Sequence, residues 1–247
     1  MHKKLSVAVL SAVLSLSYAG NACALNIFKE FGSRLTSDSM KPFARDLGGL
    51  IGAADFHSAS VTGFPGFDIG VVGSFQAKPD KDNTILRDAG VGLFGAPIIQ
   101  AEVGLPKDFG LVVRSMPISD GAPILGAGLR YGVFKHDVAK FLPDLTVSAF
   151  YDALNNDYMK FRHYSFDVTA GFNLPVVKPY VGIGFDESKL ETKVNGVGIS
   201  SGQDTKASEF RFMAGISATP FPLGYVNAGL SMNHGQLGFQ GGLGLRF

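Results

Sequence analysis

Apolar residues alternate with small or polar residues along most of the chain after residue 66. The segment 236–247 shows the pattern most clearly, because every second residue from Leu237 to Phe247 is apolar or glycine, while Gln, Gly or Arg stand between them. This period of two predicts a β-strand with one apolar and one polar face. The pattern predicts ten strands in all, at 67–77, 98–105, 109–116, 122–134, 145–153, 160–173, 177–186, 207–218, 224–232 and 236–247.

The connections between these strands differ in length in an ordered way. If the C terminus faces the periplasm, the two longest connections, 78–97 and 187–206, both lie outside the cell. Short periplasmic turns, longer outer loops and an even number of strands of about ten residues are typical of bacterial outer-membrane barrels. The pattern therefore predicts an all-β fold, an antiparallel up-and-down transmembrane β-barrel of about ten strands over residues 66–247. A soluble periplasmic β-sandwich is the alternative, and twelve strands would form if 56–62 and 85–95 each added one.

The end of the chain resembles the closing strand of Gram-negative outer-membrane β-barrel proteins. The terminal Phe247 follows Leu243 and Leu245 at alternate positions. In that family, such residues are the insertion signal that the barrel-insertion machinery reads. The resemblance implies a location in the outer membrane of a Gram-negative bacterium, contact with outer-membrane lipid and the insertion machinery as a partner.

Residues 1–24 have the three parts of a cleaved signal peptide. Lys3 and Lys4 precede an apolar stretch over 5–18, and Ala22-Cys23-Ala24 supplies the small residues of a cleavage site. Cleavage near Ala24 would remove the chain's one cysteine, so disulfides and thiol chemistry are not expected in the mature protein.

The segment 25–65 differs from the strands that follow it, because its apolar residues recur at helical spacing. The spacing predicts a short amphipathic helix at about 39–51, placed either at the periplasmic interface or inside the barrel as a plug. A plugged barrel resembles in outline the hatch of the long-chain fatty-acid transporters, which would imply uptake of a small hydrophobic molecule. The apolar residues of the predicted plug helix are Met40, Phe43, Leu47, Leu50 and Ile51.

Composition narrows the candidate partners. Only 17% of the residues are charged, below the roughly 25% usual in soluble proteins, and the formal net charge is +1, so nucleic acid is not an expected partner. The chain has 32 glycines, many of them on the predicted inward faces. Glycine within a strand often marks a close approach of another group, which favours a wall in contact with an internal segment.

Charged residues of both signs fall on the predicted inward faces and predict a polar lumen. Glu102 and Arg114 lie at similar distances from the 106–108 turn, which predicts a pair across that hairpin worth about 0.2–1 kcal/mol. The predicted lumen polar row is Asp68, Glu102, Arg114, Arg130, Asp152, His163, Asp167, Lys178, Glu209, Arg211 and Arg246.

One short run suggests chemistry. His163 and Ser165 lie two apart on one strand face, as a base and a nucleophile would. The run His-Tyr-Ser is similar to the motif of the outer-membrane lipid A 3-O-deacylases, although Phe166 stands where that family has Asn and the two residues are predicted to face the lumen. Zinc-ligand spacing, Walker and dinucleotide motifs are absent from the sequence, so no metal or cofactor is expected.

The sequence is compatible with three functions. The first is a passive channel or transporter for small or amphipathic solutes, without enzymatic activity. The second is a structural or interaction barrel that transports nothing, with 78–97 and 187–206 as its contact surface. The third is a lipid hydrolase that uses His163 and Ser165.

Overall fold

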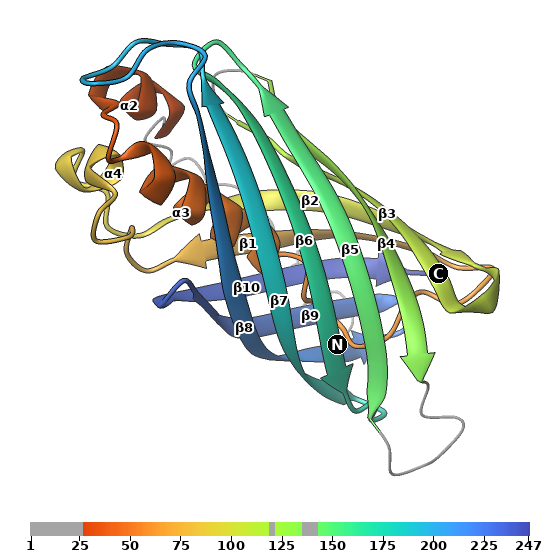
Figure 1. The fold of residues 1–247 in the computed structure, drawn as a ribbon. Coiled ribbons are helices and arrows are strands. Elements are labelled where there is room, and N and C mark those ends of the chain that lie inside the picture. Colours follow the sequence, from red (N-terminus) through yellow and green to blue (C-terminus); the bar gives the residue numbers. More distant parts are fainter. Residues whose placement is uncertain (1–26, 119–121, 135–142) are drawn as a thin grey trace, which may run out of the picture.

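The computed structural model describes residues 27–118, 122–134 and 143–247, so the predicted signal peptide at 1–24 lies outside the described residues. Ten antiparallel strands close into a barrel in which each strand pairs with its sequence neighbours and the first pairs with the last (Figure 1). The prediction of a ten-stranded antiparallel barrel is confirmed, and the sandwich is wrong. The strands are β1 (Phe67–Gln76), β2 (Phe94–Leu105), β3 (Phe109–Met116), β4 (Ile124–Phe134), β5 (Asp144–Asn155), β6 (Met159–Gly171), β7 (Val177–Thr192), β8 (Asp204–Phe221), β9 (Gly224–Asn233) and β10 (Gln236–Arg246).

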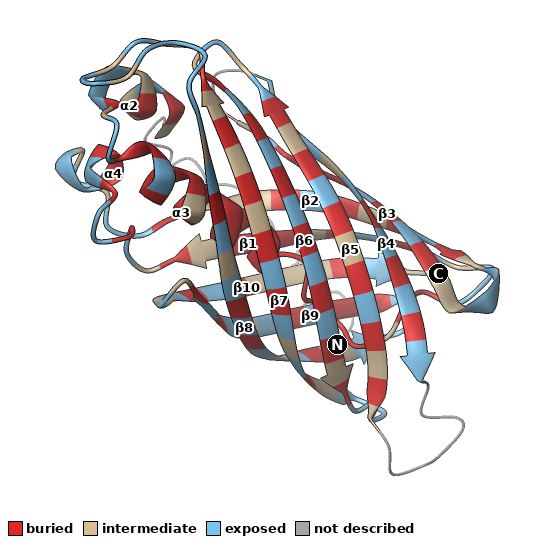
Figure 2. Ribbon diagram, viewed as in Figure 1, coloured by how far each residue is buried: buried red, intermediate tan, exposed pale blue. Residues whose placement is uncertain are grey.

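The two faces of the wall have opposite chemistry, as the alternation predicts. On β6, Phe166 is 60% exposed while His163 is fully buried, and the same alternation gives most strands in Figure 2 their banded colouring. The outward residues are mainly Val, Leu, Ile, Phe and Tyr. An apolar exterior on a closed barrel, in which no sheet edge is left unpaired, is the form in which β-strands can cross a bilayer. The chain is therefore an outer-membrane-type β-barrel.

The terminal residue helps to close the barrel. The backbone N–H of Phe247 donates to the oxygen of Phe67 at 2.8 Å, and the N–H of Phe67 donates back to the oxygen of Phe247 at 3.0 Å. The predicted final strand, β10, thus pairs with β1 from Asp68–Arg246 to Gln76–Gly238 and closes the barrel.

The hairpin of β7 and β8 is longer than predicted. Residues 187–192 continue β7 and pair with the first residues of β8, as Glu191 with Asp204 shows. The outward residues of this extension are Glu187, Lys189 and Glu191, whereas those closer to the barrel middle are apolar. An extension that projects beyond the lipid needs no apolar outer face, so it lacks the alternation from which the other strands were predicted.

The part of the chain that the structure describes also contains three α-helices: α2 (Ile27–Arg34), α3 (Met40–Ala53) and α4 (Thr84–Asp88). The twelve-strand alternative is wrong, because α4 occupies part of 85–95 and residues 56–62 are irregular. Figure 1 shows the three helices together at one end of the barrel, called here the loop end. The opposite end, called here the turn end, holds the C terminus and the turns at 106–108 and 222–223. None of the described helices is long and apolar enough to span a membrane.

Candidate functional site

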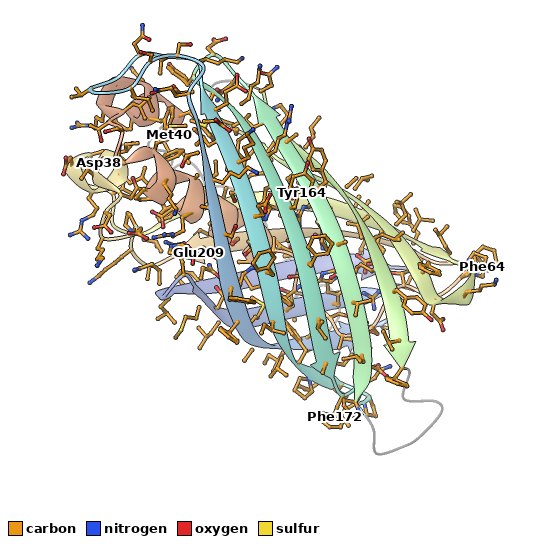
Figure 3. All side chains as sticks on the ribbon, viewed as in Figure 1. Asp38, Met40, Phe64, Tyr164, Phe172 and Glu209 are labelled. Carbon is orange, nitrogen blue, oxygen red and sulfur yellow. The ribbon has the colours of Figure 1, made fainter. Side chains whose placement is uncertain are left out.

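The N-terminal segment runs along the inward faces of the strands from one end of the barrel to the other. Figure 3 shows Met40 at the loop end and Phe64 at the turn end. Between them, the oxygen of Leu50 accepts a hydrogen bond from Ser74 of β1 at 2.8 Å, and the N–H of Thr62 donates to Glu102 of β2 at 2.7 Å. The interior of the barrel is therefore the candidate site, and its two halves differ.

The half at the loop end is an apolar core. Phe43, Leu47 and Leu50 of α3 are each at most 2% exposed. The inward wall of this half is apolar, like α3 itself. The polar side chains predicted for the lumen therefore do not line its whole length. The wall contributes Val72, Ile98, Met116, Ile124, Leu154, Met159, Phe161, Leu190 and Ala207 to the core, and α2 and α4 add Phe28, Phe31, Ile85 and Leu86.

Asp46 links α3 to the loops at the rim of this core. Its carboxylate accepts hydrogen bonds from the Gln76 amide at 2.6 Å, the Asn83 amide at 2.7 Å and the backbone N–H of Asp80 at 2.9 Å. The Nε2 of His234, in the β9–β10 turn, lies 2.8 Å from the same carboxylate. The side chain is 1% exposed, so Asp46, to which the helical spacing gave no role, connects α3 to the surrounding loops inside the protein.

In the middle of the lumen, buried arginines form ion pairs with aspartates of the wall and of the internal segment. Arg211 of β8 donates to both oxygens of Asp186, at 2.8 and 3.0 Å, and to Asp167 at 2.9 Å. Its guanidinium also donates to the backbone oxygen of Gly52 in α3 and lies 3.5 Å from Asp55. Because the Arg211 side chain is fully buried, its charge is balanced only by these neighbours.

A second arginine, Arg114, also binds Asp55. Arg114 of β3 donates to both oxygens of Asp152, at 2.7 and 2.5 Å, and also to Asp55. The other oxygen of Asp55 accepts from the Ser165 hydroxyl at 2.5 Å. Asp55, shortly after α3, therefore joins the internal segment to strands on both sides of the wall, a role that the sequence analysis did not assign.

The predicted pair of Glu102 with Arg114 is wrong. The register places Glu102 opposite Val112, and its carboxylate instead binds Arg130 of β4 at 2.7 Å. The two partners lie on strands that are separated by β3, where Gly110 stands between them. A Cβ on Gly110 would lie 2.6 Å from the Glu102 carboxylate, so the glycine leaves room for the pair.

The same arrangement recurs twice around the wall. Gly126 on β4 lies between Arg114 and Asp152, and a Cβ there would fall 1.9 Å from the carboxylate. Gly184 on β7 lies between Asp167 and Arg211, and a Cβ there would fall 2.4 Å from the Asp167 carboxylate. Part of the glycine surplus thus makes room for ion pairs. The expected contact with an internal segment accounts for other positions, such as Gly182 against the Phe56 ring.

The rest of the predicted polar row lies nearer the two rims. At the turn end, Arg246 and Tyr225 both donate to Asp68 at 2.8 Å. Near the loop end, Glu209 forms an ion pair with Arg45 of α3 at 2.6 Å, and its side chain is 28% exposed (Figure 3).

His163 and Ser165 do not contact each other as a base and nucleophile. The Nδ1 of His163 is 3.0 Å from the Ser188 hydroxyl and its Nε2 is 3.5 Å from Asp186, while Ser165 is bonded to Asp55. Both His163 and Ser165 are fully buried. In this conformation neither side chain is accessible to a lipid substrate. Among the described residues, no group of three or more His, Cys, Asp or Glu side chains is placed to hold a metal ion.

A cavity of about 180 Å³ opens at the turn end, between residues 57–58 and the wall. The predicted lumen residues Lys178 and Arg246 line it. Sequence reasoning missed its other polar residues, which carry no motif: His57, Ser58, Ser217, Thr219 and Tyr225.

The comparisons with known proteins identify a family without a known activity. Residues 85–247 match the model of DUF6588, described as a family of unknown function. No curated protein matches the chain.

Several solved structures are similar in fold. The translocator domain of the autotransporter NalP from Neisseria meningitidis is 12% identical, with a TM-score of 0.44, and the match covers 86% of this chain and all of that one. The N-terminal β-barrel domain of Pseudomonas aeruginosa OprF is 12% identical, with a TM-score of 0.39, over 74% of this chain and 98% of that one. The outer membrane protein OprG from Pseudomonas aeruginosa is 8% identical, with a TM-score of 0.37, over 77% and 99%. At these scores the likeness carries no functional argument.

Proposed function

We propose that this chain, which belongs to DUF6588, a family of unknown function, is a closed outer-membrane barrel that acts through the surface of its loop end. In this proposal residues 40–62 are a resident plug, the signal peptide is removed and the insertion machinery recognises the strand that ends in Phe247. The observation that carries the proposal is the filled lumen, apolar at the loop end and ion-paired in the middle.

The plug is costly to displace, because its apolar side chains are buried. Burial of a large apolar side chain stabilises by about 1.5–3 kcal/mol, and five such residues of α3 are at most 2% exposed: Met40, Phe43, Leu47, Leu50 and Ile51. Their exposure would cost on the order of 10 kcal/mol before any ion pair is broken. Spontaneous opening would thus be rare, which disfavours a passive channel.

The loop end offers an ordered surface for a partner. The N–H of Val197, in the loop after β7, donates to the oxygen of Leu35 at 3.0 Å, and the N–H of Ser37 donates back to the oxygen of Val197 at 3.2 Å. These bonds attach the 193–203 loop to the segment between α2 and α3. The side chain of Val197 is 77% exposed, so this combined surface presents apolar as well as polar groups to the outside.

Conductance across a planar bilayer tests the proposal. The full chain, purified from outer membranes with its heat-modifiable mobility intact, should show no steady conductance above that of lipid alone. A steady, saturable conductance from the full chain would contradict the closed barrel.

A transporter that displaces its plug is the second candidate, favoured by the open cavity beneath residues 57–58. A disulfide lock separates the two. A Cβ on Gly49 of α3 would lie 3.0 Å from the Cβ of Asn233, somewhat less than the roughly 3.5–4.5 Å across a disulfide, so a small local shift would let the pair Gly49→Cys and Asn233→Cys form a bridge. If the second candidate is right, oxidation abolishes solute passage and a reductant restores it; the closed barrel predicts that the lock changes nothing.

A further inference from the structure

The cavity at the turn end is built from both the internal segment and the wall. His57 and Ser58 cover it from the lumen, while β7, β8, β9 and β10 supply the rest of its lining. At about 30 Å³ per water, its 180 Å³ has room for about six waters or one small solute. Short turns of the kind found at this end face the periplasm in outer-membrane barrels, so the cavity opens toward periplasmic solutes.

Lys178 is the feature of this cavity that the fold does not explain. It is half-buried at the start of β7, and the carboxylate of Asp144 acts on it electrostatically, yet its ammonium forms no hydrogen bond or close ion pair with another residue in the part of the chain that the structure describes. By contrast, Arg114, Arg130 and Arg211 each bind at least one carboxylate within the lumen. A partly desolvated cation without a bonded carboxylate favours an anion as its neighbour.

A second cation faces the same space. Only the Nε of Arg246 bonds to Asp68, at 2.8 Å, and its guanidinium lies 5.5 Å from the centre of the Tyr225 ring. The remaining guanidinium N–H groups form no hydrogen bond with the described residues. Asp68 offsets the charge of Arg246 and Asp144 acts electrostatically on Lys178, but the Lys178 ammonium and the remaining Arg246 N–H groups are still available as hydrogen-bond donors.

Hydroxyl donors complete the site. Ser217 is 5% exposed and, like Thr219, lines the cavity. Two cations with several hydrogen-bond donors around one small volume complement a tetrahedral oxyanion.

We propose that the turn-end cavity binds an oxyanion of the phosphate class, held by Lys178 and Arg246 with Ser217 and Thr219 as hydroxyl donors. The source of the phosphate is either a free periplasmic solute or the headgroup of a neighbouring phospholipid. His57 and Ser58 of the proposed plug complete the lining, but the four side chains proposed to hold the anion all belong to the wall, so the phosphate titration and the conductance measurement can fail independently.

Titration with inorganic phosphate, followed by calorimetry on the full chain in a nonionic detergent, tests the site. The unmodified protein should bind saturably, and Lys178→Met should weaken binding about tenfold or more, because hydrogen bonds to charged groups are among the stronger ones. Lys178→Arg should retain most of the affinity. The matched control is Lys107→Met, which removes an exposed lysine at the same end, and it should leave the affinity unchanged. Each variant should keep its heat-modifiable mobility.

Two results would overturn the site. One is the absence of saturable binding to the unmodified protein, and the other is an equal loss in Lys107→Met and Lys178→Met. The source is identified by repeating the titration in nanodiscs. If a lipid headgroup occupies the site, the phosphodiester of phosphatidylglycerol in the discs should compete and weaken phosphate binding relative to the titration in nonionic detergent, which carries no phosphate. Equal affinity in the discs and in the detergent identifies a free anion.

Discussion

The two halves of the lumen are closed by different forces. At the loop end, apolar side chains from α3 and the wall form a core that excludes water, and charged groups lie only at its rim. In the middle and toward the turn end, the contacts are ion pairs centred on Arg114, Arg130 and Arg211, and a cavity remains open. One continuous segment, residues 40–62, takes part in both.

The two kinds of contact have different effects on the internal segment: one sets how tightly it is held, and the other sets its position along the strands. Apolar contacts at the loop end stabilise the segment inside the barrel with little dependence on pH. Buried ion pairs contribute less net stability, because desolvation offsets their attraction, but breaking one leaves an unbalanced charge. The apolar half should therefore hold the segment in place, whereas the charged half sets its register against the strands.

The largest expected effect is that of Arg211→Met. This change leaves Asp55, Asp167 and Asp186 without their shared cation and should lower the free energy of unfolding at pH 7 by about 3–5 kcal/mol. At pH 4 the loss should shrink, because protonation removes part of the unbalanced charge. Urea unfolding followed by gel mobility measures both values. The control Arg162→Met alters an exposed arginine on β6 and should stay within about 0.5 kcal/mol of the unmodified protein.

Leu50→Ala should cost nearly as much through a different mechanism. Leu50 is 1% exposed in the apolar core, and a leucine-to-alanine change at such a position removes about 2–5 kcal/mol. The same loss is expected at pH 7 and pH 4. Lys41→Ala, on the exposed face of the same helix, is the matched control. A loss that depended on pH as strongly as that of Arg211→Met would end the distinction between the two halves.

The smallest effect concerns the rim of the apolar half. Burial acts to raise the pKa of Asp80, but the N–H of Asp82 and the Arg45 guanidinium outweigh it and hold that pKa below its ordinary value of 3.8. Because the folded state lowers this pKa, Asp80 stabilises the fold above about pH 4, and its contribution is lost as the pH falls through the lowered value.

Asp80→Asn should therefore cost about 1 kcal/mol at pH 7, where an ion pair this near to water is screened. The difference from the unmodified protein should disappear as the pH falls through the lowered pKa of Asp80. Amide exchange of residues 79–88 measures it locally, and the exchange of β5 serves as the internal reference. If the Asp80→Asn variant exchanges like the unmodified protein at pH 7, the Asp80 carboxylate does not stabilise this loop.

Sequence reasoning succeeded where the environment has two distinct sides. On β6, Tyr164, Phe166 and Val168 face outward and His163 and Ser165 inward, as predicted, because lipid on one side and a polar interior on the other impose a period of two. It failed where that contrast disappears. The outward face of the 187–192 extension carries Glu187, Lys189 and Glu191, so no apolar-outward alternation marks it.

The sequence pattern also could not predict which charged residues pair inside the barrel. Glu102 binds Arg130 rather than Arg114, because the pair forms across Gly110 on an intervening strand. Asp46 and Asp55 received no role from helical spacing, yet each joins the internal segment to elements distant in sequence.

The sequence by itself determined the ten strands, their inward and outward faces and the closing role of the strand before Phe247, because these follow from local periodicity. Only the tertiary structure decided that α3 lies against the inner wall, which arginine binds which aspartate and that Lys178 faces a cavity. Those features depend on closure of the barrel, which brings side chains from separate strands into one small volume where charge and space must both be balanced.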